Sequence, residues 1–385
     1  MSHGELIFCG ESEEMVTFFS DCGYACPEYS NPFDYYVDLT SVDTRSKERE
    51  LETYGRIHVL VDAYQNTEIW KNMLDKINEY GTKIPSQATP FRNKDSPATI
   101  CKLGILLRRT VRNLSRNRIG IIMRLFQNVF FALFMAFFLM RLSNDVLKGA
   151  IQDRLGLLFQ SIGAPAYLGA LNAVALFPAL RAVSDQESED GLYQKWHMML
   201  AYKIHIIPFS TLSMLFFGGF LYWAVGLYPD VLRFLTYFAV LLIFHFIGEY
   251  LAVALLGLVR NPNIVNSVAA LIIVAGVLLG SGFLRTTEDM PTVFLWLSYL
   301  TFQKYGTEIL VINEFYGKTF TCGNFNSTTN NPNCAFAQGI NFIDKLYPGA
   351  PSRFTIDFVV LSVFVPLIVI IGIINFKIRD FIIRR

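Results

Sequence analysis

The chain has 385 residues, 52% of them hydrophobic, and 34 are phenylalanine. A soluble domain of this size does not need so much apolar surface, so an ordinary soluble enzyme is excluded as the first interpretation. The formal net charge of +1 favours no class of charged partner, and we expect no nucleic-acid partner.

Residues 1–56 alternate short apolar runs with turn signals. This pattern predicts a strand and a helix, followed by an irregular stretch broken at Pro27 and Pro32. The segment is too short to hold a full core, so we expect the end of a domain whose earlier part is missing. Its first ten residues have neither the basic nor the apolar region of a signal peptide. Residues 57–97 predict a charged helix and then a linker.

Residues 98–118 predict an amphipathic connecting helix. Apolar side chains recur there at helical spacing with arginines between them, at Leu103, Leu107, Val111 and Leu114. Such a helix is expected to lie on the cytoplasmic face of a membrane. The alternative is a solvated helix packed on the N-terminal segment.

Residues 119–385 predict a transmembrane domain of six helices, so the fold class is mainly α. An apolar stretch of about 20 residues crosses ~30 Å of hydrocarbon, and only a helix satisfies its own backbone there. The predicted spans are Ile119–Met140, Gly156–Leu180, Met199–Leu227, Val231–Val259, Ile264–Leu284 and Phe354–Phe376, with a large extracellular loop at 285–353. Basic residues before the first span and after the last place both termini in the cytoplasm.

Several stretches resemble one transporter family. The segment GELIFCGESEEMVTFFSDCGYACPEYSNPFDYYVDL resembles the end of the nucleotide-binding domain in G-subfamily ABC transporters. The remaining elements are similar in order to that family's half-transporters: linker, connecting helix, six spans and a large loop before the last. The stretches LRAVSDQESEDGLYQKW and TFQKYGTEILVINEFYG resemble the sterol-exporting members. The resemblance implies a six-helix domain after a short cytoplasmic α/β remnant, in the plasma membrane and apical in polarised cells.

The resemblance also implies a function. The expected activity is ATP-driven export of cholesterol and plant sterols by a heterodimer with a second G-subfamily half-transporter, among membrane lipids. ATP and Mg are the cofactors of the complete family transporter. This sequence has no GxxxxGK[ST] loop, no LSGG and no Walker B acid, so we expect it to bind neither and to lack ATPase activity alone. The alternative is a truncated, non-transporting fragment that pairs with a full-length partner and modulates it.

Polar side chains inside the spans are candidates for function. His245 and Glu249 lie four residues apart in the fourth span and share one helix face. Asn172 in the second span and Ser267 in the fifth could complete a polar network that rearranges during transport. The alternatives are static hydrogen bonds between helices and proton coupling.

Two other sets of charges have simpler interpretations. Arg124 near the cytoplasmic end of the first span favours an interfacial anchor over a functional role. Asp153 and Arg154 at the outer end of the second span predict a local ion pair.

The fifth span and the loop between spans two and three carry further candidates. Gly276 and Gly280 form a GxxxG pattern, which allows close helix packing. The resemblance places this span near the dimer axis and implies that Phe283 and Leu284, with Ala275, form a valve on the substrate path. In the acid-rich loop Arg181–Lys195 it implies a coupling role for Glu187 and Tyr193.

The cysteines favour one disulfide and no metal site. Cys322 and Cys334 lie in the large loop outside the membrane, where a disulfide is expected. Between them Asn326 begins a glycosylation sequon in the same compartment. Cys22 and Cys26 lack a second pair of ligands, so zinc is not expected and the remaining cysteines predict free thiols.

Overall fold

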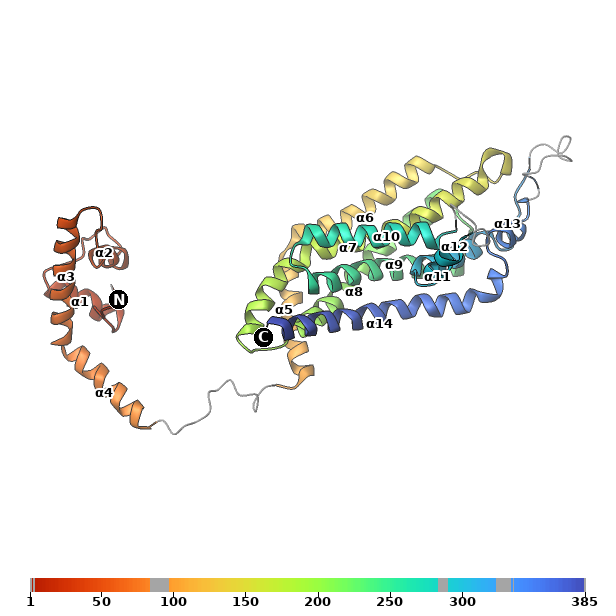
Figure 1. The fold of residues 1–385 in the computed structure, drawn as a ribbon. Coiled ribbons are helices and arrows are strands. Elements are labelled where there is room, and N and C mark those ends of the chain that lie inside the picture. Colours follow the sequence, from red (N-terminus) through yellow and green to blue (C-terminus); the bar gives the residue numbers. More distant parts are fainter. Residues whose placement is uncertain are drawn as a thin grey trace. The chain divides into compact units, whose positions relative to one another are not determined.

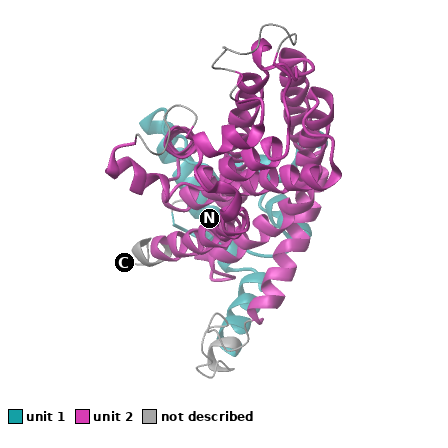
Figure 2. Cartoon of the chain, turned by 90° about the vertical axis from the view of Figure 1, so that its right-hand side faces the viewer, with its two compact units in different colours: residues 1–95 teal, residues 96–385 magenta. Residues whose placement is uncertain are grey.

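The computed structural model describes residues 2, 4–83, 97–282, 290–322, 334 and 336–383. The chain divides into two compact units, residues 1–95 and residues 96–385 (Figure 2). The described residues are mainly helical, and their β structure is limited to three isolated bridges. The expectation of a mainly α protein is confirmed.

Unit 1 is a small helical body. Its helices are α1 (Ser12–Asp21), α2 (Pro32–Leu39), α3 (Lys47–Gln65) and α4 (Glu68–Lys83). Asn31 caps α2 by accepting from the Phe33 backbone N–H at 3.1 Å, and Pro32 suits the first helical position. The core includes Phe19 stacked on Tyr36, with ring centroids 4.3 Å apart.

The strand expected near residues 4–10 is not present in the described part of unit 1. That region contains an isolated bridge between Ser2 and Glu5 and otherwise irregular backbone. A strand must pair its backbone with a neighbour, and the described residues of this unit supply helices instead. Helix α3 runs through the expected domain boundary at 56 and packs Ile57 and Tyr64 into the same core as Tyr36.

The described residues of unit 2 contain six helices long and apolar enough to cross a membrane, as the sequence predicts. They are α6 (Arg118–Leu139), α7 (Ala150–Glu189), α8 (Lys195–Val225), α9 (Val231–Leu258), α10 (Pro262–Gly280) and α14 (Ala350–Ile383). Helix α9 is the most buried of the six and packs against α7, α8, α10 and α14 (Figure 1). The amphipathic α5 (Thr99–Arg116) packs against α8 through buried Leu106 and Thr110.

Helices α7 and α9 approach each other closely through two glycines. A methyl group on Gly248 would lie 1.8 Å from the backbone oxygen of Ala166, and one on Gly169 would lie 2.3 Å from the backbone oxygen of His245. Small residues permit such backbone contact between membrane helices, where lipid gives no hydrophobic drive for association. This contact fixes the position of the face of α9 that carries His245 and Glu249.

The predicted loop at 181–195 is mostly helical. Helix α7 continues to Glu189, so the connection to α8 spans residues 190–194. Ion pairs hold this acid-rich end in helical form: Asp185 lies 3.2 Å from Arg379 of α14 and 3.4 Å from Lys195 of α8. Arg379 is distant in the sequence and Lys195 lies beyond the turn. Hydropathy alone therefore does not reveal that α7 extends to Glu189.

The predicted loop at 285–353 also contains structured segments. Helices α11 (Thr292–Ser298), α12 (Phe302–Phe315) and α13 (Gly339–Leu346) lie within it, and α12 is buried against α10 and α14. The charged residues of α12 make the segment look solvent-exposed in the sequence. In the structure the charges are paired, as Lys304 is with Glu308 at 3.2 Å. Cys322 and Cys334 form the predicted disulfide. Asn326 lies outside the described residues.

Candidate functional site

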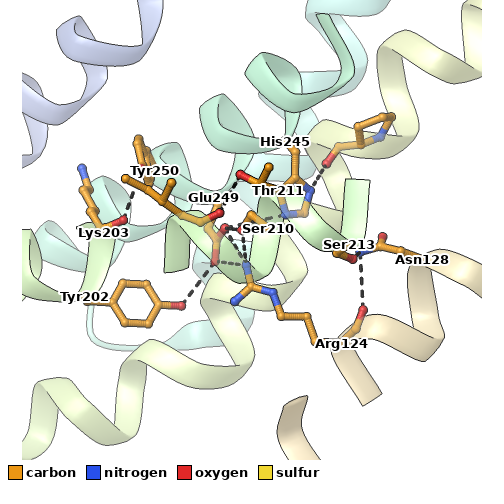
Figure 3. A network of polar contacts seen from close by, with 12 residues as sticks. Arg124, Asn128, Tyr202, Lys203, Ser210, Thr211, Ser213, His245, Glu249 and Tyr250 are labelled. Atoms are coloured by element: carbon orange, nitrogen blue, oxygen red, sulfur yellow. Dashed lines mark hydrogen bonds and ion pairs between the residues drawn. The ribbon is translucent and has the colours of Figure 1, made fainter. Parts of the chain in front are cut away.

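A buried ion pair between Arg124 and Glu249 joins α6 to α9 and lies within a cluster of polar side chains (Figure 3). Arg124 Nη2 lies 2.8 Å from each carboxylate oxygen of Glu249. The side chains are 7% and 0% exposed, so both charges are removed from solvent. Pairing is the usual condition for an ionisable group at this depth.

Helix α8 completes the surroundings of Glu249. Ser210 Oγ donates to the carboxylate at 3.0 Å and receives a hydrogen bond from Arg124 Nη2 at 2.6 Å. The Tyr202 hydroxyl reaches the other carboxylate oxygen at 3.5 Å. The carboxylate therefore has donors from two helices besides its own, and Figure 3 shows these side chains pointing toward one another.

His245 connects the same cluster to α7. Its Nδ1 lies 3.1 Å from the backbone oxygen of Pro165, and because a carbonyl only accepts, Nδ1 carries the proton. Its Nε2 is 3.7 Å from Glu249, which is too long for a hydrogen bond, and the contact is an ion pair only when both ring nitrogens are protonated. The expected shared face of His245 and Glu249 is present, but the principal partner of Glu249 is Arg124.

A second contact extends the network along α6 and α8. The Asn128 amide donates to Ser213 Oγ and to the backbone oxygen of Arg124, the latter at 3.4 Å. The side chains of Asn128 and Ser213 are both fully buried. The network therefore ties α6, α8 and α9 through side chains, and α7 through one backbone carbonyl.

Three expectations about this region need correction. The interpretation of Arg124 as an interfacial anchor is wrong, because the guanidinium is buried against Glu249. Asn172 is buried, but its amide nitrogen makes no hydrogen bond to the described residues. Ser267 is on the surface of unit 2 and donates to the backbone of Asn263. The sequence signal that could have indicated this pair is a basic residue in the first span and an acidic residue in the fourth.

An apolar groove of about 560 Å³ lies between α6, α7 and α10. The lining residues are Phe131, Phe159, Gln160, Gly163, Ala164, Tyr167, Leu168, Ala270, Ile273, Val274, Val277 and Leu278. Only Gln160 and Tyr167 carry polar atoms in their side chains. Ala275 is partly buried and does not line it, and Phe283 and Leu284 lie outside the described residues.

The GxxxG glycines pack inside this chain. A methyl group on Gly276 would lie 2.4 Å from the Gln303 side chain, and one on Gly280 would lie 2.5 Å from Thr301 Oγ1. Both glycines therefore face α12 and the residue before it. The sequence could not show this partner because α12 was hidden in the expected loop.

The two candidates near the α7–α8 turn touch each other. Tyr193 donates to Glu187 at 2.5 Å, and Arg109 of α5 lies 2.5 Å from the same carboxylate. Burial, followed by the hydrogen bond to Glu187, raises the pKa of Tyr193. Arg109 was not singled out from the sequence, since it is one of several similar arginines on α5. The three residues connect α5 to the end of α7.

At the opposite end of the bundle the predicted Asp153–Arg154 ion pair is wrong. Arg154 is buried and pairs with Glu314 of α12 at 2.9 Å. Glu314 also accepts from the Tyr228 backbone N–H at 2.9 Å and from Lys318. Burial lowers the pKa of Lys318 despite this carboxylate. Among the described residues, no group of His, Cys, Asp and Glu is arranged to hold a metal ion.

Comparison with known proteins gives a consistent result. Residues 102–315 match the family model described as ABC-2 type transporter. The chain is 58% identical over its full length to ATP-binding cassette sub-family G member 5 of Homo sapiens, and it spans 59% of that protein. It is 25% identical to sub-family G member 8 of Homo sapiens over 83% of this chain and 49% of that protein. Because the family model covers more than half of the residues, this chain belongs to the family of ABC-2 type transporters.

Proposed function

We propose that this chain is the transmembrane part of a G-subfamily half-transporter that exports sterols as a heterodimer with a second half-transporter. The apolar groove between α6, α7 and α10 is the observation that carries this proposal. Its volume of about 560 Å³ falls within the ~300–1,000 Å³ typical of sites for small molecules. A sterol needs an apolar slot with a polar contact for its single hydroxyl group.

The groove supplies both features. Gln160 and Tyr167 lie two turns apart on α7, so either side chain could contact the hydroxyl while the apolar residues contact the rings. Two lining residues on α10 remain exposed, Val274 at 56% and Leu278 at 48%. This exposure leaves the groove open to a second subunit, which would complete the path.

The polar network supports the transport step. It ties α9 to α6, α8 and α7 with one buried ion pair at its centre. A change in the relative position of these helices would have to give Glu249 other partners, because its side chain is fully buried. Such a network favours two discrete helix arrangements over a continuous range.

The energy for transport would come from nucleotide-binding domains and not from the residues that the structure describes. ATP and Mg would bind to the nucleotide-binding domains of the complete transporter, and we assign no step of hydrolysis to this chain. The cluster of Arg109, Glu187 and Tyr193 is the proposed point at which such a domain would act on α5 and α7. The α7–α8 turn would then face the cytoplasm, and the disulfide would face outward.

Filling the groove provides the test. Ala164→Trp would place an indole in the groove. Because the indole would occupy the space of the sterol, we expect labelling of the reconstituted chain by a photoreactive sterol to fall about tenfold. The matched control is Leu271→Trp, since Leu271 is exposed on α10 outside the groove. Equal labelling of the two variants, or labelling confined to peptides outside α7 and α10, contradicts the proposal.

A further inference from the structure

Lys203 on α8 carries a buried amine that the polar network does not use. The residue is 2% exposed, and its Nζ makes no hydrogen bond to any residue that the structure describes. No described carboxylate oxygen therefore lies at hydrogen-bond distance from this nitrogen. In Figure 3 the Lys203 nitrogen points away from Glu249.

Three helices enclose this amine with uncharged groups. Nζ lies 4.9 Å from the centre of the Tyr250 ring of α9, and the Tyr250 hydroxyl donates to the backbone oxygen of Lys203 at 3.2 Å. On α14, a methyl group at Gly372 would lie 3.1 Å from Nζ, 3.1 Å from Met199 Sδ and 3.5 Å from the Cβ of Ala254. The face of an aromatic ring attracts a cation far less than a carboxylate does.

The charges on the surrounding helices have other partners. Helices α6, α8 and α9 contain one acidic residue, Glu249, and Arg124 already pairs with it at 2.8 Å. The described bases of α14 that follow Gly372 are Lys377, which contacts a ring on α8, and Arg379, which pairs with the end of α7. A proton on the amine would add a buried charge without a counter-charge among the described residues, a state that burial strongly disfavours.

Contact with water would reverse this preference, because the pKa of an exposed lysine is ~10.4. Lys203 lies eight residues after Lys195, the first residue of α8. Side chains of an α-helix lean toward its N-terminus, so a released Lys203 would extend toward Lys195 and the predicted cytoplasmic surface. Helix α14 covers Nζ at Gly372, so the packing of α14 decides whether the amine can reach water.

We propose that Lys203 is a proton-binding switch at the junction of α8, α9 and α14. The amine is neutral while α14 packs over it, and it takes up a proton from water when α14 moves away. Lower pH therefore favours the open arrangement, since that arrangement binds the additional proton. Tyr250 connects the junction to Glu249, its neighbour in the sequence, so the switch would act on the helices that carry the buried ion pair. It does not depend on which substrate is carried.

Carbon-13 NMR of the detergent-solubilised full chain, labelled at lysine Cε, tests the protonation state. The Lys203 signal is assigned by its loss in Lys203→Met. We expect this signal to be that of a neutral amine at about pH 9 and of a protonated amine at about pH 5.5, whereas an exposed lysine is still mostly protonated at about pH 9. The matched control is the signal of Lys148, which is exposed. A protonated Lys203 at about pH 9, or a neutral one at about pH 5.5, would overturn the switch.

A disulfide between α9 and α14 tests the role of α14. A Cβ at position 372 would lie 3.5 Å from that of Ala254, which is within the ~3.5–4.5 Å of a disulfide. In the oxidised double variant Ala254→Cys with Gly372→Cys, we expect Lys203 to stay neutral at about pH 5.5. Each single cysteine variant cannot form this bridge and should titrate as the unmodified chain does. Equal titration with and without the bridge would overturn the coupling to α14.

Thermal unfolding gives an independent readout. Between about pH 7 and pH 9 we expect the unfolding temperature of the unmodified chain to rise by about 4 °C relative to Lys203→Met, since the unfolded chain binds a proton that the packed chain excludes. Lys203→Arg carries a charge that cannot be removed, so it should unfold earlier than Lys203→Met at both pH values. Lys148→Met should keep the pH dependence of the unmodified chain. The same pH dependence in the unmodified chain and in Lys203→Met would contradict the proposal.

Discussion

Replacing Glu249 with leucine is expected to cost about 3–5 kcal/mol of stability, because it leaves the buried Arg124 guanidinium without its counter-charge. Ser210 would remain as a neutral acceptor and could not compensate for a full charge. A loss of this size is a large fraction of the ~5–15 kcal/mol that stabilises a typical protein. Thermal unfolding of the detergent-solubilised chain, together with its monodisperse yield, measures the effect.

The double variant Arg124→Met with Glu249→Leu is the control for this explanation. Exchanging both members of a buried ion pair for apolar residues of similar volume is often neutral, so the double variant should recover much of the lost stability. If it unfolds as early as Glu249→Leu alone, an unpaired arginine is not the cause.

Glu249→Gln separates a switching role from a static one. Glutamine keeps the shape and can still accept hydrogen bonds, but it carries no charge. If the ion pair must exchange partners during transport, sterol efflux by a complete transporter should fall several-fold at normal surface expression. Normal efflux with Gln would leave the network as a structural tie between helices.

Gly248→Ala is expected to separate α7 from α9, because its methyl group would lie 1.8 Å from the backbone oxygen of Ala166. A backbone atom in a packed helix cannot move aside as a flexible side chain can. We expect a loss near the top of the ~1–3 kcal/mol range for overpacking, seen as a lower unfolding temperature of the solubilised chain.

Gly156→Ala on α7 is the matched control, since a methyl group there meets no atom within 4 Å. Alanine is the better helix former by about 0.5–1 kcal/mol, so this variant should be neutral or slightly more stable. The close approach of α7 and α9 is refuted if the two alanine variants unfold at the same temperature.

The sequence was sufficient for the features that depend on local composition. Each of the six spans is long and apolar, and in a bilayer such a segment must form a helix because it has no other partner for its backbone. The disulfide followed from two cysteines in a segment expected to lie outside the membrane. The common face of His245 and Glu249 followed from helical periodicity alone.

The tertiary structure decided which polar groups meet, because pairing between helices depends on contacts that no periodicity encodes. Arg124 and Glu249 are 125 residues apart, and Arg154 and Glu314 are 160 apart. The sequence predicts a loop where α12 lies, because the charged residues of this helix lower its hydropathy. In the folded chain its buried carboxylates form ion pairs with Arg154, Lys318 and Arg353. Local composition thus determined the membrane helices, and three-dimensional packing alone determined their partners, since a buried charge is stable only where the fold supplies its counter-charge.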